Sequence, residues 1–266
     1  MEKEINSVIK YFSFFAYRPT LEEIHTFLKA KINKNDFKKE LNRLKYTPPQ
    51  YSIKRKISRK KLNNWRYKAY IKLISFLPQI KLVGLSGSIS MMNADLNDDI
   101  DLFIITQKER LYTGRFLATI FAYIIGLKRG IKLHKAPNKV CLNLFFDEKN
   151  LQVPKFKQTE FVGHEVLQMR PIIIKDNIYE RFLEANRWTF RLFPNAKSVF
   201  SMKYKVSSIK KILNTKYFIL DTFFDKIELI LKKLQLSLIK KHQTTEIITN
   251  TQLWFHPDDF EKKIKY

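Results

Sequence analysis

The stretch from Lys81 to Thr106 reads KLVGLSGSISMMNADLNDDIDLFIIT, and it decides the fold expected for the chain. An apolar run leads into Gly87 and Ser88, where small residues let the backbone approach a ligand closely. A polar connection follows, and a second apolar run begins with Asp99 and Asp101. Because side chains alternate along a strand, these two carboxylates are expected on one face. The stretch therefore predicts two strands joined by a small-residue turn, with a pair of acids at the start of the second strand.

The two acids suggest a metal site. Carboxylates at positions i and i+2 beside a glycine turn offer the hard oxygen ligands that suit Mg²⁺ and a polyphosphate. Asp99 and Asp101 also begin a very apolar strand, where an unpaired charge is costly unless a cation satisfies it. The alternative is an ordinary polar strand end, since D-x-D pairs are common there. Neighbouring Asp98 has the opposite strand parity and is expected to be a solvated turn residue.

This pattern of an apolar residue, Gly-Ser, a spacer and Asp-apolar-Asp-apolar resembles the signature of the DNA polymerase β superfamily of nucleotidyltransferases. The resemblance implies that Gly87 and Ser88 hold the triphosphate of a nucleoside triphosphate (NTP), while Asp99 and Asp101 bind one or two Mg²⁺ ions. An acceptor hydroxyl would then attack the α-phosphate and release pyrophosphate. The fold expected is α/β (α+β), a small mixed β-sheet flanked by helices.

Further motifs extend the resemblance over nearly the full length, to a group of uncharacterised bacterial proteins that join an N-terminal winged-helix-like unit to a nucleotidyltransferase domain. Met92 departs from that group, which tends to have glycine at this position, and a bulky residue there would narrow the pocket. The motifs are TLEEI at 20–24, GSISMMNAD at 87–95, DIDLFIIT at 99–106, KVCLN at 139–143, HEVLQM at 164–169 and FHP at 255–257.

The resemblance also implies a third carboxylate on a later strand, where it completes the metal site and helps to take the acceptor's proton. At the expected place the chain has Asn143, the usual residue of the group, and an amide cannot act as a general base. Asp147 and Glu165 are alternatives, although a turn at 147–150 and a helix from Thr159 to Met169 give each a structural role. The strand is expected over 139–146, with one face formed by Val140, Leu142, Leu144 and Phe146.

Three weaker candidates are expected to line the nucleotide pocket, namely Arg115, Lys139 and Asn143. Arg115 lies early in a helix expected from Arg110 to Leu127 and could reach a phosphate, with a surface or salt-bridge role as the alternative. Cys141 is interpreted as a small buried residue rather than a nucleophile, because no activating base is evident near it in the sequence.

The N-terminal residues 1–55 predict a helical, winged-helix-like module. Apolar spacing indicates helices over 2–15 and 35–45, and TLEE at Thr20 is a capping box that starts another. The segment from Tyr46 to Ile53 is the expected wing, although Pro48-Pro49 interrupts it. Basic residues over 34–61 make nucleic acid a candidate partner of this module, and docking to a protein is the alternative.

A nucleotidyltransferase core is expected over 56–155 and a C-terminal helical region over 156–266. Helices are predicted there over 178–193 and 217–241. The second is basic and amphipathic, which is typical of a core or partner helix and also of a helix that lies on a membrane.

Composition bears on partners and compartment. The net charge of +25 favours an acidic partner, although an AT-rich genome gives the same bias toward lysine. The single Cys141 excludes an internal disulfide, and no disulfide-linked partner is expected. The start lacks a signal-peptide pattern, and the apolar run 116–127 is short of the roughly 20 residues that cross a bilayer. A cytoplasmic protein without a membrane partner is therefore expected.

The sequence thus predicts a Mg²⁺-dependent nucleotidyltransferase that moves a nucleoside monophosphate from an NTP to an acceptor hydroxyl. The alternative is a non-catalytic regulator that keeps the fold to sense a nucleotide or to bind nucleic acid. Asn143 and Met92 favour the regulator, whereas the intact Gly-Ser and D-x-D favour the enzyme.

Overall fold

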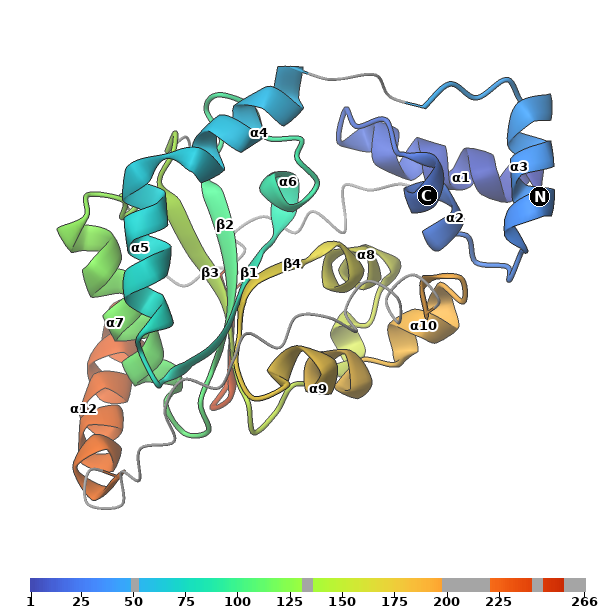
Figure 1. Ribbon diagram of the computed structural model, residues 1–266. Helices are drawn as coiled ribbons and strands as arrows, with labels where there is room; N and C mark the ends of the chain where they lie inside the picture. Colours follow the sequence, from blue (N-terminus) through green and yellow to red (C-terminus); the bar gives the residue numbers. More distant parts are fainter. Residues whose placement is uncertain (49–52, 131–135, 198–220, 241–245, 256–266) are drawn as a thin grey trace.

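The computed structural model describes residues 1–48, 53–130, 136–197, 221–240 and 246–255 (Figure 1). Its centre is a six-stranded mixed sheet with the strand order β4-β1-β2-β3-β6-β5. Helices lie on both faces of this sheet. The predicted α/β (α+β) class is confirmed.

The stretch that decides the fold forms the two central strands. β1 (Ile80–Leu85) and β2 (Ile100–Thr106) are antiparallel, as expected for strands joined by a short connection. β3 (Val140–Asp147) runs parallel to β2, so the starts of β2 and β3 lie side by side. The remaining strands are β4 (Arg170–Ile174) beside β1, and β6 (Gln252–Trp254) and β5 (Ile247–Ile248) beyond β3.

Two apolar layers hold the helices to the sheet. One layer joins alternate residues such as Val83 and Leu102 to α5 (Trp65–Ser75), α7 (Leu111–Ile124) and α12 (Asp221–Lys240). The other joins Leu82 and Phe103 to α8 (Glu160–Gln168), α9 (Ile178–Ala185) and α10 (Trp188–Leu192). Because both faces are covered, β1 and β2 read as nearly continuous apolar runs. No helix among the described residues is long and apolar enough to cross a membrane.

A bulge in β3 changes which side chains share a face. Leu102 pairs with Leu142 but Phe103 pairs with Leu144, so Asn143 is the extra residue. After the bulge Leu144 packs in the α8 layer, whereas Val140 and Leu142 pack in the α7 layer. The uniform alternation predicted for 139–146 is therefore wrong beyond Leu142.

The helix predicted over 178–193 is instead two helices, α9 and α10. Asn186 lies buried between them, and its amide reaches the loop after β3. Its Oδ1 accepts from the backbone N–H of Val153 at 2.9 Å and its Nδ2 donates to the carbonyl of Leu151 at 2.9 Å. An asparagine that bonds backbone outside its own helix favours a break at this point.

The N-terminal unit consists of α1 (Glu2–Phe14), α2 (Leu21–Thr26) and α3 (Lys34–Arg43). The capping box predicted at Thr20 is confirmed, with Glu23 as its partner. The core of this unit also includes Leu167 of α8 and Phe193 after α10, so the unit packs directly on that side of the molecule. Of the expected wing, 46–48 contains no strand and 49–52 lies outside the described residues.

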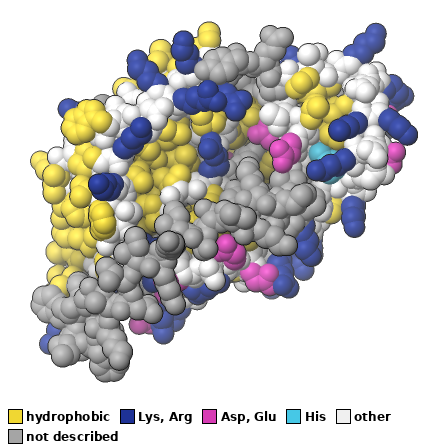
Figure 2. All heavy atoms as spheres, in the orientation of Figure 1, with side chains coloured by type: hydrophobic (Ala, Val, Ile, Leu, Met, Phe, Trp, Pro, Cys, Tyr) yellow, Lys and Arg dark blue, Asp and Glu magenta, His cyan; other side chains and the backbone are white. Residues whose placement is uncertain are grey.

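The basic run before β1 forms α4 (Ile53–Asn63), and its Lys and Arg side chains gather over this helix in Figure 2. The division predicted between 55 and 56 falls inside α4. The described part of 156–266 forms three strands as well as helices, and the helix predicted over 217–241 is present as α12, with 217–220 and 241 outside the described residues. Lys61 is the exception in the run: it is buried, and its ammonium donates to the carbonyls of Leu96 and Asp98 and to the side chain of Asn138. This lysine holds the connection before β2 in place.

Candidate metal and nucleotide site

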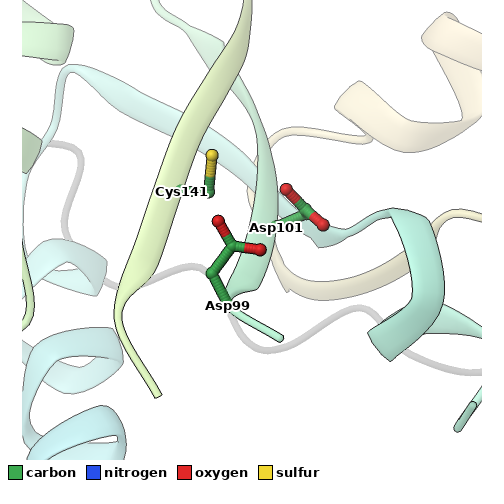
Figure 3. Close-up of side chains that lie close together, drawn as sticks. All are labelled: Asp99, Asp101 and Cys141. Carbon is green, nitrogen blue, oxygen red and sulfur yellow. The ribbon is translucent and has the colours of Figure 1, made fainter. Parts of the chain in front are cut away.

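Three ligand atoms converge where β2 and β3 begin (Figure 3). Asp99 immediately precedes β2, Asp101 lies on it, and Cys141 is the register partner of Asp101 on β3. One ligand atom from each side chain lies within 4.8 Å of the other two, and all three residues are partly exposed. Asp99 and Asp101 share a face as the strand parity predicts. The cluster can hold a metal ion.

The glycine turn lies directly against this cluster. Gly87 begins α6 (Gly87–Ser90) with φ of +58°, a left-handed conformation that favours glycine. A Cβ at this position would lie 2.7 Å from Oδ2 of Asp101, closer than van der Waals contact. The glycine turn and the Asp101 carboxylate thus lie side by side, as predicted. The hydroxyl of Ser88 bonds a different carboxylate, because it donates to Oδ2 of Asp98 at 2.9 Å.

Asp98 itself is a structural residue rather than a free turn residue. Besides the Ser88 hydroxyl, it accepts the backbone N–H of Asp95 at 2.9 Å. Met92, in the same connection, has φ of +57°, which explains physically why a glycine suits that position.

A third carboxylate, that of Glu165 on α8, lies beside the glycine turn. Glu165 accepts a hydrogen bond from the backbone N–H of Gly87 and interacts electrostatically with Asp101. Burial first, and then Asp99 and Glu165, raise the pKa of Asp101 to about 7. Burial likewise raises the pKa of Glu165 to about 7. Carboxylates crowded in this way favour either a bound proton or a cation.

Arg129 supplies a cation that sequence reasoning missed. Its Nη1 lies 2.6 Å from Oδ2 of Asp99 and 3.4 Å from Sγ of Cys141. The position of Arg129 in the basic turn before β3 could have indicated this contact, because the start of β3 lies beside the start of β2, where Asp99 and Asp101 are found. Burial and the neighbouring carboxylates raise the pKa of the Cys141 thiol, which keeps it protonated.

Asn143 joins the site through the bulge. Its Nδ2 donates to Oδ1 of Asp101 at 3.0 Å, so the amide orients this carboxylate. Its buried Oδ1 has no hydrogen-bond partner among the residues that the structure describes. The amide therefore stands beside the cluster, at the place where a third carboxylate was expected, but cannot serve as a base.

Arg115 and Lys139, which were predicted to line the nucleotide pocket, direct their charged groups to other partners. Arg115 is on α7, on the other face of the sheet, where it bonds Gln235 at 2.6 Å and stacks 4.6 Å from the ring of Phe255. Burial lowers its pKa to about 10. The ammonium of Lys139 donates to the carbonyl of Gly126, just after α7, at 2.6 Å. Lys139 directly precedes β3 beside the cluster, but among the described residues neither its ammonium nor the Arg115 guanidinium bonds Asp99 or Asp101.

Asp147, the other alternative for a third acid, is also remote from the cluster. It pairs in register with Thr106 at the opposite end of β2 and accepts the backbone N–H groups of Glu109 and Lys149. Burial raises its pKa to about 6. The structure gives Asp147 the turn role that the sequence offered as its alternative.

Comparisons with known proteins give no further guide to the site. No family model, curated protein or solved structure matches this chain. The function must therefore be argued from the residues described above.

Proposed function

We propose that this protein is a Mg²⁺-dependent nucleotidyltransferase that transfers a nucleoside monophosphate from an NTP to an acceptor hydroxyl. The observation that carries the proposal is the close approach of Gly87 to Asp101 beside the Asp99–Asp101 pair, where a Cβ on Gly87 would lie 2.7 Å from the carboxylate. A turn that only glycine fits lets the backbone lie directly against the paired carboxylates, beside the place proposed for the metal and the phosphates. The resemblance of the sequence to the DNA polymerase β superfamily is consistent with this chemistry.

The donor set fits the metal. Asp99 and Asp101 offer carboxylate oxygens, the ligands that Mg²⁺ prefers, and would hold it at the start of β2. When bound, Mg²⁺ neutralises charge on the phosphates and on the leaving pyrophosphate. The Asn143 amide holds Asp101 in orientation through its 3.0 Å hydrogen bond. Gly87 and Ser88 carry donors that now bond Glu165 and Asp98, beside the place proposed for the triphosphate.

Glu165 is the residue we assign to accept the proton of the acceptor hydroxyl. It lies next to Gly87 and close enough to Asp101 to raise its pKa. A pKa of about 7 is near the value that suits a general base in neutral solution. Glu165→Gln keeps an acceptor for the Gly87 N–H, so transfer should fall while NTP binding persists. A loss of NTP binding equal to the loss of transfer would assign Glu165 a structural role instead.

The test is label transfer. Each α-³²P-labelled NTP is incubated with the protein and Mg²⁺ in the presence of cellular RNA, protein and small-molecule fractions. The wild type should label one of these fractions, and the variants Asp99→Asn and Asp101→Asn should not. Asp147→Asn is the matched control, because this buried acid lies at the far end of the same strand pair. Transfer by none of the proteins into any fraction would refute the enzyme.

A second candidate function is a non-catalytic regulator that binds a nucleotide or nucleic acid. One observation favours it: the guanidinium of Arg129 forms an ion pair with Asp99 at 2.6 Å and compensates its charge. Exposed basic residues on α3, just after it and on α4 support nucleic acid as its ligand, namely Lys34, Lys38, Lys45, Lys56 and Lys60. Nucleotide or RNA binding without any label transfer would favour this function, and the binding of RNA should then weaken in a Lys56→Ala/Lys60→Ala variant.

A further inference from the structure

We propose that Asp99, Asp101 and Cys141 form a site for a thiophilic divalent cation of the Zn²⁺ class, which competes with Mg²⁺. The three ligand atoms come from two adjacent strands and lie within 4.8 Å of one another. Cys141 faces Asp101 in register, so the backbone of the sheet fixes their separation. The thiol is thus part of the site rather than a residue near it.

Ligand chemistry separates the two cations. Mg²⁺ takes oxygen ligands and keeps several waters, so the sulfur of Cys141 contributes nothing to it. Zn²⁺, Co²⁺ and Cd²⁺ bind thiolate together with carboxylate, and Zn²⁺ sites with three protein ligands leave a fourth position for water or a ligand. A set of two carboxylates and one thiol therefore favours the thiophilic ions.

Two further observations indicate that these side chains are arranged around a cation. The Arg129 guanidinium contacts both Asp99 and Cys141 through the same nitrogen, Nη1. Asn143, whose Nδ2 donates to Asp101, also carries a buried Oδ1 that has no hydrogen-bond partner in the described part of the chain, and this oxygen is a neutral donor next to the cluster. A cation that bound here would replace Arg129 as the partner of Asp99 and Cys141.

Binding is a ligand exchange without redox chemistry. The bond from Sγ of Cys141 to the metal replaces the S–H bond, and the proton passes to solvent. Arg129 breaks its contacts with Asp99 and Cys141 and turns outward. The consequence for catalysis rests on the function proposed above: Zn²⁺ should inhibit Mg²⁺-dependent transfer because both ions need Asp99 and Asp101.

The experiment uses Co²⁺ as a spectroscopic probe on the untagged full chain. Cys141 is the only cysteine, so a sulfur-to-Co²⁺ charge-transfer band in the near ultraviolet can come from no other residue. The wild type should show this band, and Zn²⁺ should abolish it by displacement. Cys141→Ser and Cys141→Ala should lose the band and bind Co²⁺ at least about ten-fold more weakly. Replacing a residue that only hydrogen-bonds a metal ligand already lowers metal affinity roughly 10–100-fold, so the loss of a ligand should have at least this effect. Both variants should bind Mg²⁺ as the wild type does.

Two results would overturn the proposal: Co²⁺ that binds without a charge-transfer band, or equal Co²⁺ affinity in the wild type and both Cys141 variants. Circular dichroism of the two variants establishes that they are folded before the comparison is made. The band is measured without NTP, so its absence refutes the thiophilic site alone. Failure of label transfer, with the band present, refutes the nucleotidyltransferase alone.

Discussion

Replacing Gly87 by alanine tests whether the glycine turn and the carboxylates form one site. The backbone at Gly87 has φ of +58°, and placing a side chain in this left-handed conformation costs about 1–2 kcal/mol. The new Cβ would also lie 2.7 Å from Oδ2 of Asp101, so this carboxylate must move by several tenths of an ångström. Sites of this kind tolerate displacements of only about 0.5 Å. Gly87→Ala should therefore lose both stability and metal binding.

Gly126→Ala is the matched control. Gly126 has φ of +72°, but nothing among the described residues lies within 4 Å of the Cβ position, so this variant has the same backbone strain without the contact. Urea unfolding should show that Gly126→Ala loses about 1–2 kcal/mol and that Gly87→Ala loses at least as much. Calorimetric titration with Mg²⁺ and a non-hydrolysable NTP should show weaker binding in Gly87→Ala alone. Equal binding by the two variants would refute the assignment of the turn to the site.

Three further predictions concern stability. Asp101→Asn should stabilise the metal-free protein at pH 8 by at most about 4 kcal/mol, because the folded-state pKa of Asp101 is raised from 3.8 to about 7. The favourable contribution of the protonated acid is fully present below pH 3.8 and is lost as the pH rises from there through 7, so urea unfolding at pH 4 should show a smaller gain. His164 stacks on Tyr11, and burial lowers its pKa well below 6.5. The stability of the wild type should therefore fall as the pH drops below 6.5, where the histidine of the unfolded chain takes up a proton. Urea unfolding between pH 7 and 5 should show a smaller loss of stability for His164→Phe than for the wild type. Lys61→Ala removes the hydrogen bonds from the buried ammonium to the carbonyls of Leu96 and Asp98 and should lose about 1–3 kcal/mol in urea unfolding. The variant of its exposed neighbour, Lys60→Ala, should change stability by no more than about 0.5 kcal/mol.

The local parts of the site could be predicted from the sequence because each depends on neighbouring residues. Strand parity placed Asp99 and Asp101 on one face, and the small residues of the turn indicated its close approach. The capping box at Thr20 was equally local. These features follow from spacing along one segment, which a single sequence displays.

The rest depends on packing between distant segments. Glu165 reaches Gly87 only because α8 packs on the face of the sheet that carries Asp101. The position of Asn143 depends on a bulge, which leaves no mark in an otherwise regular apolar pattern. The expectation for Arg115 failed for the same reason, since the face of the sheet that α7 covers is set by the crossover to β3.

The measurement that tests the central claim most directly is equilibrium binding of a non-hydrolysable NTP with and without Mg²⁺. The wild type and Asp147→Asn, whose substitution lies at the far end of β3, should bind only when Mg²⁺ is present. Asp101→Asn should bind neither the metal nor the nucleotide. Binding that needs no Mg²⁺, or that survives in Asp101→Asn, would contradict the claim that Gly87 and the two aspartates form a single metal-nucleotide site.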